Sequence, residues 1–131
     1  MRVVVVDDSV AVQQGLGRLL EAVAGVSVVG NAEAVDDALR LIESTRPDVV
    51  VLDVDLRGGE RGMNVLRHVV REHPGMRVIM LSNFGWQAMR DGFLRAGASA
   101  YFDKSLEFMK ARDWIADRVT AGTGTASPVL Q

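Results

Sequence analysis

The sequence contains no cysteine, which excludes disulfide bonds and thiolate metal sites. It also lacks a long apolar run, since the aliphatic stretch at residues 3–6 is too short to span a membrane and no small-residue cleavage site follows it. Charges of the two signs nearly cancel, giving a net charge of −2, so no general attraction to nucleic acid or anionic lipid exists. We therefore expect a cytoplasmic protein without direct contact to nucleic acid or membrane.

Aliphatic residues are what the sequence has in quantity. Of its 131 residues 48% are hydrophobic, which is enough for one core and leaves no room for a second folded domain. The last segment is small and polar and shows no apolar stripe. We expect a domain at residues 1–119 and a flexible tail or linker stub at residues 120–131.

Short β-branched runs, each bounded by polar residues or glycine, recur along the chain. They predict strands at residues 3–6, 26–29, 49–52, 78–81 and 99–102. Between and after these runs apolar residues recur at helical spacing, which predicts five helices. The run at 49–52 is apolar without alternation, as in a parallel strand covered on both faces. The fold class is therefore α/β, a doubly wound parallel sheet of five strands with five helices on both faces.

Chemically distinctive side chains follow four of the expected strands: Asp7 with Asp8, Asp53, Ser82, and Lys104. Ligands of open α/β sheets bind beyond the carboxyl ends of the strands, so these groups should share one edge. Clustered carboxylates repel one another unless they hold a cation, and oxygen ligands suit Mg²⁺. A lysine and a hydroxyl beside them complete a setting for a phosphoryl group.

Four segments in order carry a resemblance to a known family: residues 3–9 (VVVVDDS), 50–56 (VVLDVDL), 78–83 (VIMLSN) and 97–104 (GASAYFDK). Together they resemble the receiver domains of two-component response regulators, either standing alone or as part of a longer chain. The likeness covers roughly residues 1–119. It implies the flavodoxin-like strand order 2-1-3-4-5 and a phosphorylation-controlled signalling module.

The resemblance also implies a role for each acidic residue. Asp53 would be the phosphoacceptor, phosphorylated by a histidine kinase or a phosphotransfer protein. Mg²⁺ would be held by Asp7, Asp8, Asp53 and the backbone carbonyl of Asp55.

The remaining implied roles concern the switch. Lys104 and Ser82 would each bind a phosphoryl oxygen, and Tyr101 would turn inward as Ser82 moves. That movement would repack the face formed by the fourth helix, the fifth strand and the fifth helix. The same face would contact an unknown downstream protein, and it is where a homodimer would form.

Three features depart from the family pattern. The loop at residues 56–62 is longer than usual and lacks the customary proline, and Ser105 replaces the proline that usually gives a cis peptide after the lysine. Asn83 and Phe84 are bulky next to Ser82, and we expect them to restrict access of water and to slow phosphate loss.

Two other functions remain open. The segment Asp53-Val54-Asp55 resembles the paired aspartates of haloacid-dehalogenase phosphatases, although their nucleophile strand normally comes first and this chain has no cap domain. A phosphate-independent interaction domain is the other alternative. We expect no enzyme activity beyond the chain's own phosphotransfer and dephosphorylation.

Several residues have a plain structural interpretation beside a functional one. His68 and His73 have the wrong spacing for metal ligands on one helix face and are expected to be solvated. Tyr101 is either half-buried core or a switch. Four residues are either core or an apolar contact surface: Trp86, Met89, Phe93 and Trp114.

Overall fold

The computed structural model describes residues 1–126 as alternating strands and helices. The strands are β1 (Arg2–Val6), β2 (Ser27–Ala32), β3 (Val49–Asp53), β4 (Arg77–Ser82) and β5 (Ala100–Asp103). The helices are α1 (Val10–Glu21), α2 (Val35–Thr45), α3 (Gly62–Glu72), α4 (Gln87–Arg95) and α5 (Phe108–Ala126), with a short 3-10 turn η1 (Arg57–Gly59).

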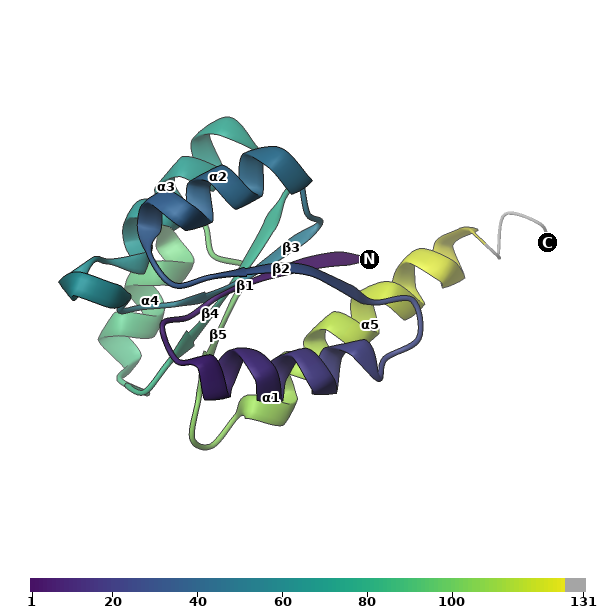
Figure 1. The fold of residues 1–131 in the computed structure, drawn as a ribbon. Coiled ribbons are helices and arrows are strands. Elements are labelled where there is room, and N and C mark those ends of the chain that lie inside the picture. The colour runs from purple at the N-terminus through teal and green to yellow at the C-terminus, as the bar shows by residue number, and fades with distance from the viewer. Residues whose placement is uncertain (127–131) are drawn as a thin grey trace.

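All strand pairs are parallel, and the sheet has the order β2-β1-β3-β4-β5, which confirms the expected fold class (Figure 1). Helices α2 and α3 lie side by side over one face, while α1 and α5 cover the other. The order places β1 and β3 next to each other at the centre, so the residues that follow them meet at one edge of the sheet.

Alternation along the central strands divides the core into two layers. In β1, Val4 and Val6 face the layer that contains Leu66 of α3, whereas Val3 and Val5 face the layer that contains Leu20 of α1. All four valines are fully buried, which explains why β1 and β3 have no polar alternation. The two layers hold the strand ends, and with them the polar edge, in fixed positions.

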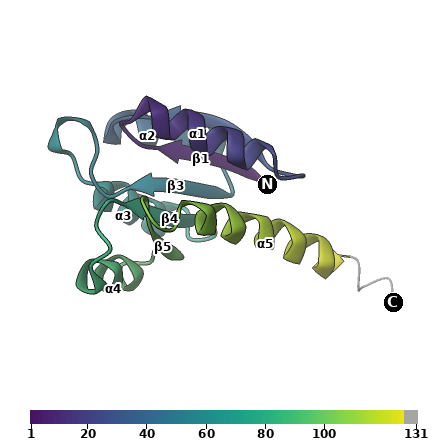
Figure 2. The same cartoon turned by 90° about the horizontal axis from the view of Figure 1, so that it is seen from below.

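Local signals set the ends of some elements. Ser9 caps the N-terminus of α1, because its Oγ accepts a hydrogen bond of 3.3 Å from the backbone N–H of Val12. At the other end of the chain, α5 continues past Val119 to Ala126 and extends beyond the sheet (Figure 2). The predicted tail at residues 120–131 thus overlaps α5, and residues 127–131 lie outside the described part of the chain. No helix among the described residues is long and apolar enough to cross a membrane.

Candidate functional site

The polar residues predicted from the strand ends do come together. Asp53 ends β3 and Ser82 ends β4, while Asp7 and Lys104 directly follow β1 and β5. A hollow of about 350 Å³ lies at this edge, and the residues around it include Asp8, Asp53, Ser82 and Lys104. The parallel order of the sheet therefore brings residues from four strands around one space.

Lys104 is the cation of this site. Its Nζ lies 2.6 Å from Oδ2 of Asp7 and 2.9 Å from Oδ2 of Asp53, and its side chain is 10% exposed. Burial by itself would lower the pKa of Lys104, but its bonds to Asp7 and Asp53 outweigh burial and raise the pKa. Lys104 therefore stays charged and balances part of the negative charge around it.

Asp53 lines the hollow and is 7% exposed. Burial raises the pKa of its carboxyl group to about 6, although the ammonium group of Lys104 acts in the opposite direction. The nearby charge of Asp7 adds to the increase. A buried carboxyl group whose pKa is raised this far by its surroundings is typical of a functional site.

Three carboxylates at this edge suit a divalent cation. Asp7, Asp8 and Asp53 each offer an oxygen, and these atoms lie within 4.8 Å of one another. Oδ2 of Asp7 is buried, and among the described residues its close partner is the ammonium group of Lys104 at 2.6 Å. Hard oxygen ligands with spare acceptor capacity fit Mg²⁺. For Asp55 the structure shows a backbone N–H that lies 3.4 Å from Oδ1 of Asp53, and the role of its carbonyl stays a prediction.

A chain of hydrogen bonds connects Ser82 to Tyr101. Oγ of Ser82 accepts from the backbone N–H of Phe84 at 2.9 Å, and the carbonyl of Phe84 accepts from the hydroxyl of Tyr101 at 2.7 Å. Tyr101 is 2% exposed, so its ring is already buried in this structure. The structure therefore does not display the inward turn expected for Tyr101. Burial also raises the pKa of the Tyr101 hydroxyl.

Arg90 of α4 ties the same region to α5. Its guanidinium donates to the backbone carbonyl of Tyr101 and to Oε1 of Glu107, both at 3.0 Å. It also lies 5.5 Å from the centre of the Tyr101 ring. Sequence reasoning did not predict this bridge, because its three members lie in different parts of the chain and only Tyr101 belongs to one of the recognised segments.

The long loop after β3 is closed at its base. Asp55 and Arg61 form an isolated antiparallel bridge, and the N–H of Leu56 donates to the carbonyl of Glu60 at 2.9 Å. Gly62 follows, and a Cβ built on it would lie only 2.1 Å from the backbone carbonyl oxygen of Asp53. The additional residues of the loop therefore extend away from its paired base, and Gly62, which has no side chain, allows α3 to pack close to the end of β3.

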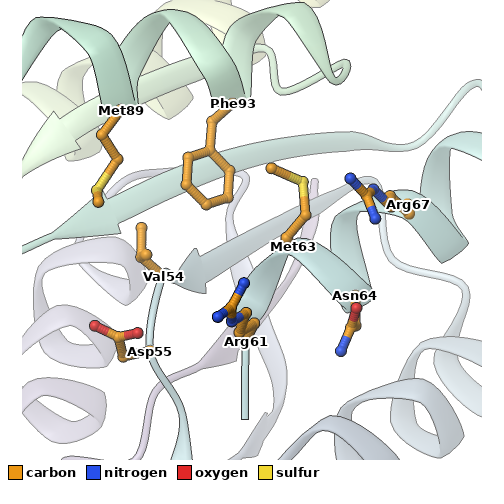
Figure 3. Close-up of a pocket in the computed structure, with 8 residues that line it drawn as sticks. All are labelled: Val54, Asp55, Arg61, Met63, Asn64, Arg67, Met89 and Phe93. Atoms are coloured by element: carbon orange, nitrogen blue, oxygen red, sulfur yellow. The ribbon is translucent and has the colours of Figure 1, made fainter. Parts of the chain in front are cut away.

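A second hollow of about 440 Å³ lies beside the first, between α3 and α4 (Figure 3). Met63, Met89 and Phe93 give it an apolar side, and Asp55 and Arg61 lie toward the loop after β3. Phe93 is 7% exposed and belongs to the core, whereas Trp86, just before α4, is 64% exposed. Of the two interpretations, core therefore applies to Phe93, and an exposed apolar contact surface applies to Trp86.

The structure contradicts the expectation that both histidines are solvated. Nε2 of His68 lies 2.9 Å and Nε2 of His73 lies 2.7 Å from Oε1 of Glu43, and the two side chains are 21% and 11% exposed. The argument from helical spacing was wrong because α3 ends at Glu72, and His73 leaves the helix with a φ of −137°. This group could not be predicted from the strand ends, because its members lie in or directly after α2 and α3.

Comparisons with known proteins identify the family of this chain. The family described as response regulator receiver domain matches residues 3–116. The DNA-binding transcriptional activator DevR/DosR of Mycobacterium tuberculosis is 38% identical over 111 residues, which cover 84% of this chain and 50% of that protein. The response regulator GacA of Pseudomonas viridiflava is 34% identical over 104 residues, which cover 79% and 48%.

A solved structure gives the same result. A two-component response regulator of the LuxR family from Aurantimonas sp. SI85-9A1 matches with a TM-score of 0.83 and 32% identity, over 92% of this chain and 85% of that one. The fold is that of a signalling module, and the chain belongs to the response regulator receiver domain family of two-component systems. It spans about half the length of the curated relatives it matches.

Proposed function

We propose that Asp53 accepts a phosphoryl group from a histidine kinase or a phosphotransfer protein, with Mg²⁺ bound by Asp7, Asp8, Asp53 and the carbonyl of Asp55. The observation that carries this proposal is the position of Asp53, a buried residue that lines an acidic hollow, with Nζ of Lys104 2.9 Å from its Oδ2. Membership in the receiver family supports it, because phosphorylation on aspartate and Mg²⁺ dependence are general properties of that family.

In the proposed reaction a carboxylate oxygen of Asp53 attacks phosphorus, and the bond between phosphorus and the donor's imidazole nitrogen breaks. The electron pair of that bond stays on the donor nitrogen, and Asp53 becomes an acyl phosphate. Lys104 would pair with one phosphoryl oxygen and Ser82 would donate its hydroxyl to another. Bound Mg²⁺ would offset the negative charge on the phosphoryl oxygens.

The signal would leave the site through the backbone of Phe84. If Ser82 turns to a phosphoryl oxygen, its Oγ no longer accepts from the N–H of Phe84, whose carbonyl holds the hydroxyl of Tyr101. The segment after β4 would then shift, and phosphorylation would favour one position of Tyr101 over another. Arg90 extends the effect, since it bridges the Tyr101 carbonyl to Glu107 near the start of α5.

The face of α4, β5 and α5 would therefore present the signal to a downstream protein or to a second copy of the chain. Exposed apolar side chains on this side, Trp86, Leu94 and Met109, support a role in contact. Asn83 and Phe84 line the hollow that contains Asp53, which supports the expectation of slow phosphate loss. Activity as a phosphatase toward other substrates is not expected, because Asp53 lies on the third strand rather than the first.

The test uses beryllofluoride, an acyl-phosphate mimic, with tryptophan fluorescence as the signal. Trp114→Phe isolates Trp86, whose ring lies 5.1 Å from that of Phe84. We expect Mg²⁺ with beryllofluoride to change the Trp86 emission in this background and not after Asp53→Asn. Glu72→Gln, an exposed change of equal charge, serves as the matched control. A response that survives Asp53→Asn would contradict the proposed phosphoacceptor.

Intact mass after incubation with acetyl phosphate provides a second measurement. We expect the gain of one phosphoryl group that requires Asp53 and Mg²⁺. If the mass rises and the fluorescence stays flat, Asp53 is the acceptor but the proposed route through Phe84 is wrong.

A further inference from the structure

A second group of metal-ligand side chains lies away from the acidic hollow. Glu43 comes from the last turns of α2, His68 from α3, and His73 from the residue that follows α3. Each offers one ligand atom, and these atoms lie within 4.8 Å of one another. In the alternating fold these helix ends precede β3 and β4, so the group lies at the amino ends of the strands and not at the carboxyl ends.

The geometry of this group is convergent. Nε2 of both histidines points to the same oxygen, Oε1 of Glu43, at 2.9 Å and 2.7 Å, and the two rings are 5.9 Å apart. The other oxygen of Glu43 lies 3.6 Å from the guanidinium of Arg46, which leaves Oε1 to the histidines. Two imidazoles and one carboxylate are a common ligand set for zinc and other divalent transition metals.

The surroundings also favour a cation. The carboxyl ends of α2 and α3 present the negative ends of two helix dipoles. The histidine side chains are mostly buried, and His73 lines an open hollow beside the amino ends of β3 and β4, which gives an ion and its water ligands access.

We propose that Glu43, His68 and His73 bind a divalent transition-metal ion and thereby join α2 to α3. On binding, each imidazole carries its proton on Nδ1 and directs the lone pair of Nε2 to the metal, so the two contacts with Glu43 are replaced by bonds to a shared ion. Water completes the coordination. The site is independent of the phosphoacceptor proposed above, because no residue belongs to both.

The composition of the chain makes the test direct. His68 and His73 are its only histidines and it has no cysteine, so no other imidazole or thiolate competes. We would titrate ¹⁵N-labelled protein with ZnCl₂ in the presence of excess Mg²⁺, and follow the ring nitrogens of both histidines by NMR. The expected result is that the Nε2 signals of both residues shift together and saturate at one zinc ion per chain. Ring signals that do not respond to zinc would overturn the proposal.

Variants test the ligand set by calorimetry. We expect His68→Gln, His73→Gln and Glu43→Gln each to weaken zinc binding by at least about tenfold, since even outer-sphere partners of metal ligands contribute that much. Glu72→Gln, a neighbouring exposed acid with the same charge change, should bind zinc as the wild type does. Wild-type affinity in both histidine variants would refute the assignment.

Two further results separate this site from the acidic hollow. Asp53→Asn should leave the zinc-dependent shifts of the histidine signals unchanged. Zinc should also raise the unfolding midpoint of the wild type and of Asp53→Asn, but not that of His73→Gln. If Asp53→Asn removes the histidine shifts, zinc acts through the acidic hollow and the proposed site is wrong.

Discussion

Replacement of Gly62 by alanine tests how closely α3 must approach the end of β3. A Cβ at this position would lie 2.1 Å from the carbonyl oxygen of Asp53 and 3.2 Å from that of Val54. Both obstacles are backbone atoms, and Gly62 donates its own N–H to the carbonyl of Val54 at 2.8 Å. A side-chain rotation therefore cannot relieve the contact, and the start of α3 or the end of β3 has to move.

We expect Gly62→Ala to destabilise the fold by about 2 to 3 kcal/mol, the upper part of the range for overpacked buried positions. For a domain of this size that loss lowers the unfolding midpoint by roughly 8 to 12 °C. Because the displaced atoms belong to Asp53, the variant should also respond less to beryllofluoride than the wild type under conditions where both are folded.

The matched control is Gly15→Ala in the middle of α1, where a new Cβ would meet no atom within 4 Å. Alanine is favoured over glycine inside a helix, so this variant should gain about 0.5 to 1 kcal/mol. Thermal unfolding followed by circular dichroism gives both values, and they should have opposite signs. A midpoint for Gly62→Ala within about 2 °C of the wild type would refute the argument from close approach.

Three further results are expected from the site. Without Mg²⁺, Asp53→Asn should raise the free energy of unfolding at pH 7 by about 1 to 2 kcal/mol, because burial raises the folded-state pKa of Asp53 to about 6 and so disfavours its ionised form. This gain in stability should shrink as the pH falls toward 4, where the carboxyl group is protonated in the folded state. A gain that does not depend on pH would contradict this cause. Mg²⁺ should raise the unfolding midpoint of the wild type, and Asp8→Asn should reduce that increase; an equal increase in both would exclude Asp8 as a ligand. Tyr101→Phe should lower the free energy of unfolding, measured with denaturant, by about 1 kcal/mol, because it removes the hydroxyl that donates to the carbonyl of Phe84. It should also weaken the change in Trp86 fluorescence on addition of beryllofluoride. An unchanged fluorescence response would show that this hydrogen bond does not transmit the signal.

Sequence reasoning located the elements well where burial is complete. The central strand β3 begins at Val49 as predicted, because both of its faces are covered and its residues from Val49 to Leu52 are all apolar. The edge strand β2 is different: it was predicted at residues 26–29 and lies at Ser27–Ala32, since it continues through the polar residue Asn31. An edge strand needs no continuous apolar run, and its pairing with β1 also shifts register between Val3 and Val4.

The residues of the site also fall into a predictable and an unpredictable group. Residues at strand ends could be predicted to meet, because the topology alone brings Asp53 and Lys104 to one edge. Contacts that depend on side-chain direction or on where a helix ends could not be predicted. The group around Glu43 is one such case, and the bridge from Arg90 to Tyr101 is another.

The bridge between Asp55 and Arg61 has a consequence for how this chain tolerates change in length. Because the two ends of the loop are paired with each other, residues between them can vary in number without moving Asp53. Gly58 and Gly59, both exposed and with positive φ, form its outer turn, and the entropy of closing a flexible loop grows only slowly with its length. This loop should therefore tolerate a peptide epitope or a small reporter inserted between these two glycines. Such an insertion would label the protein near the acidic hollow and leave every side chain of that hollow in place.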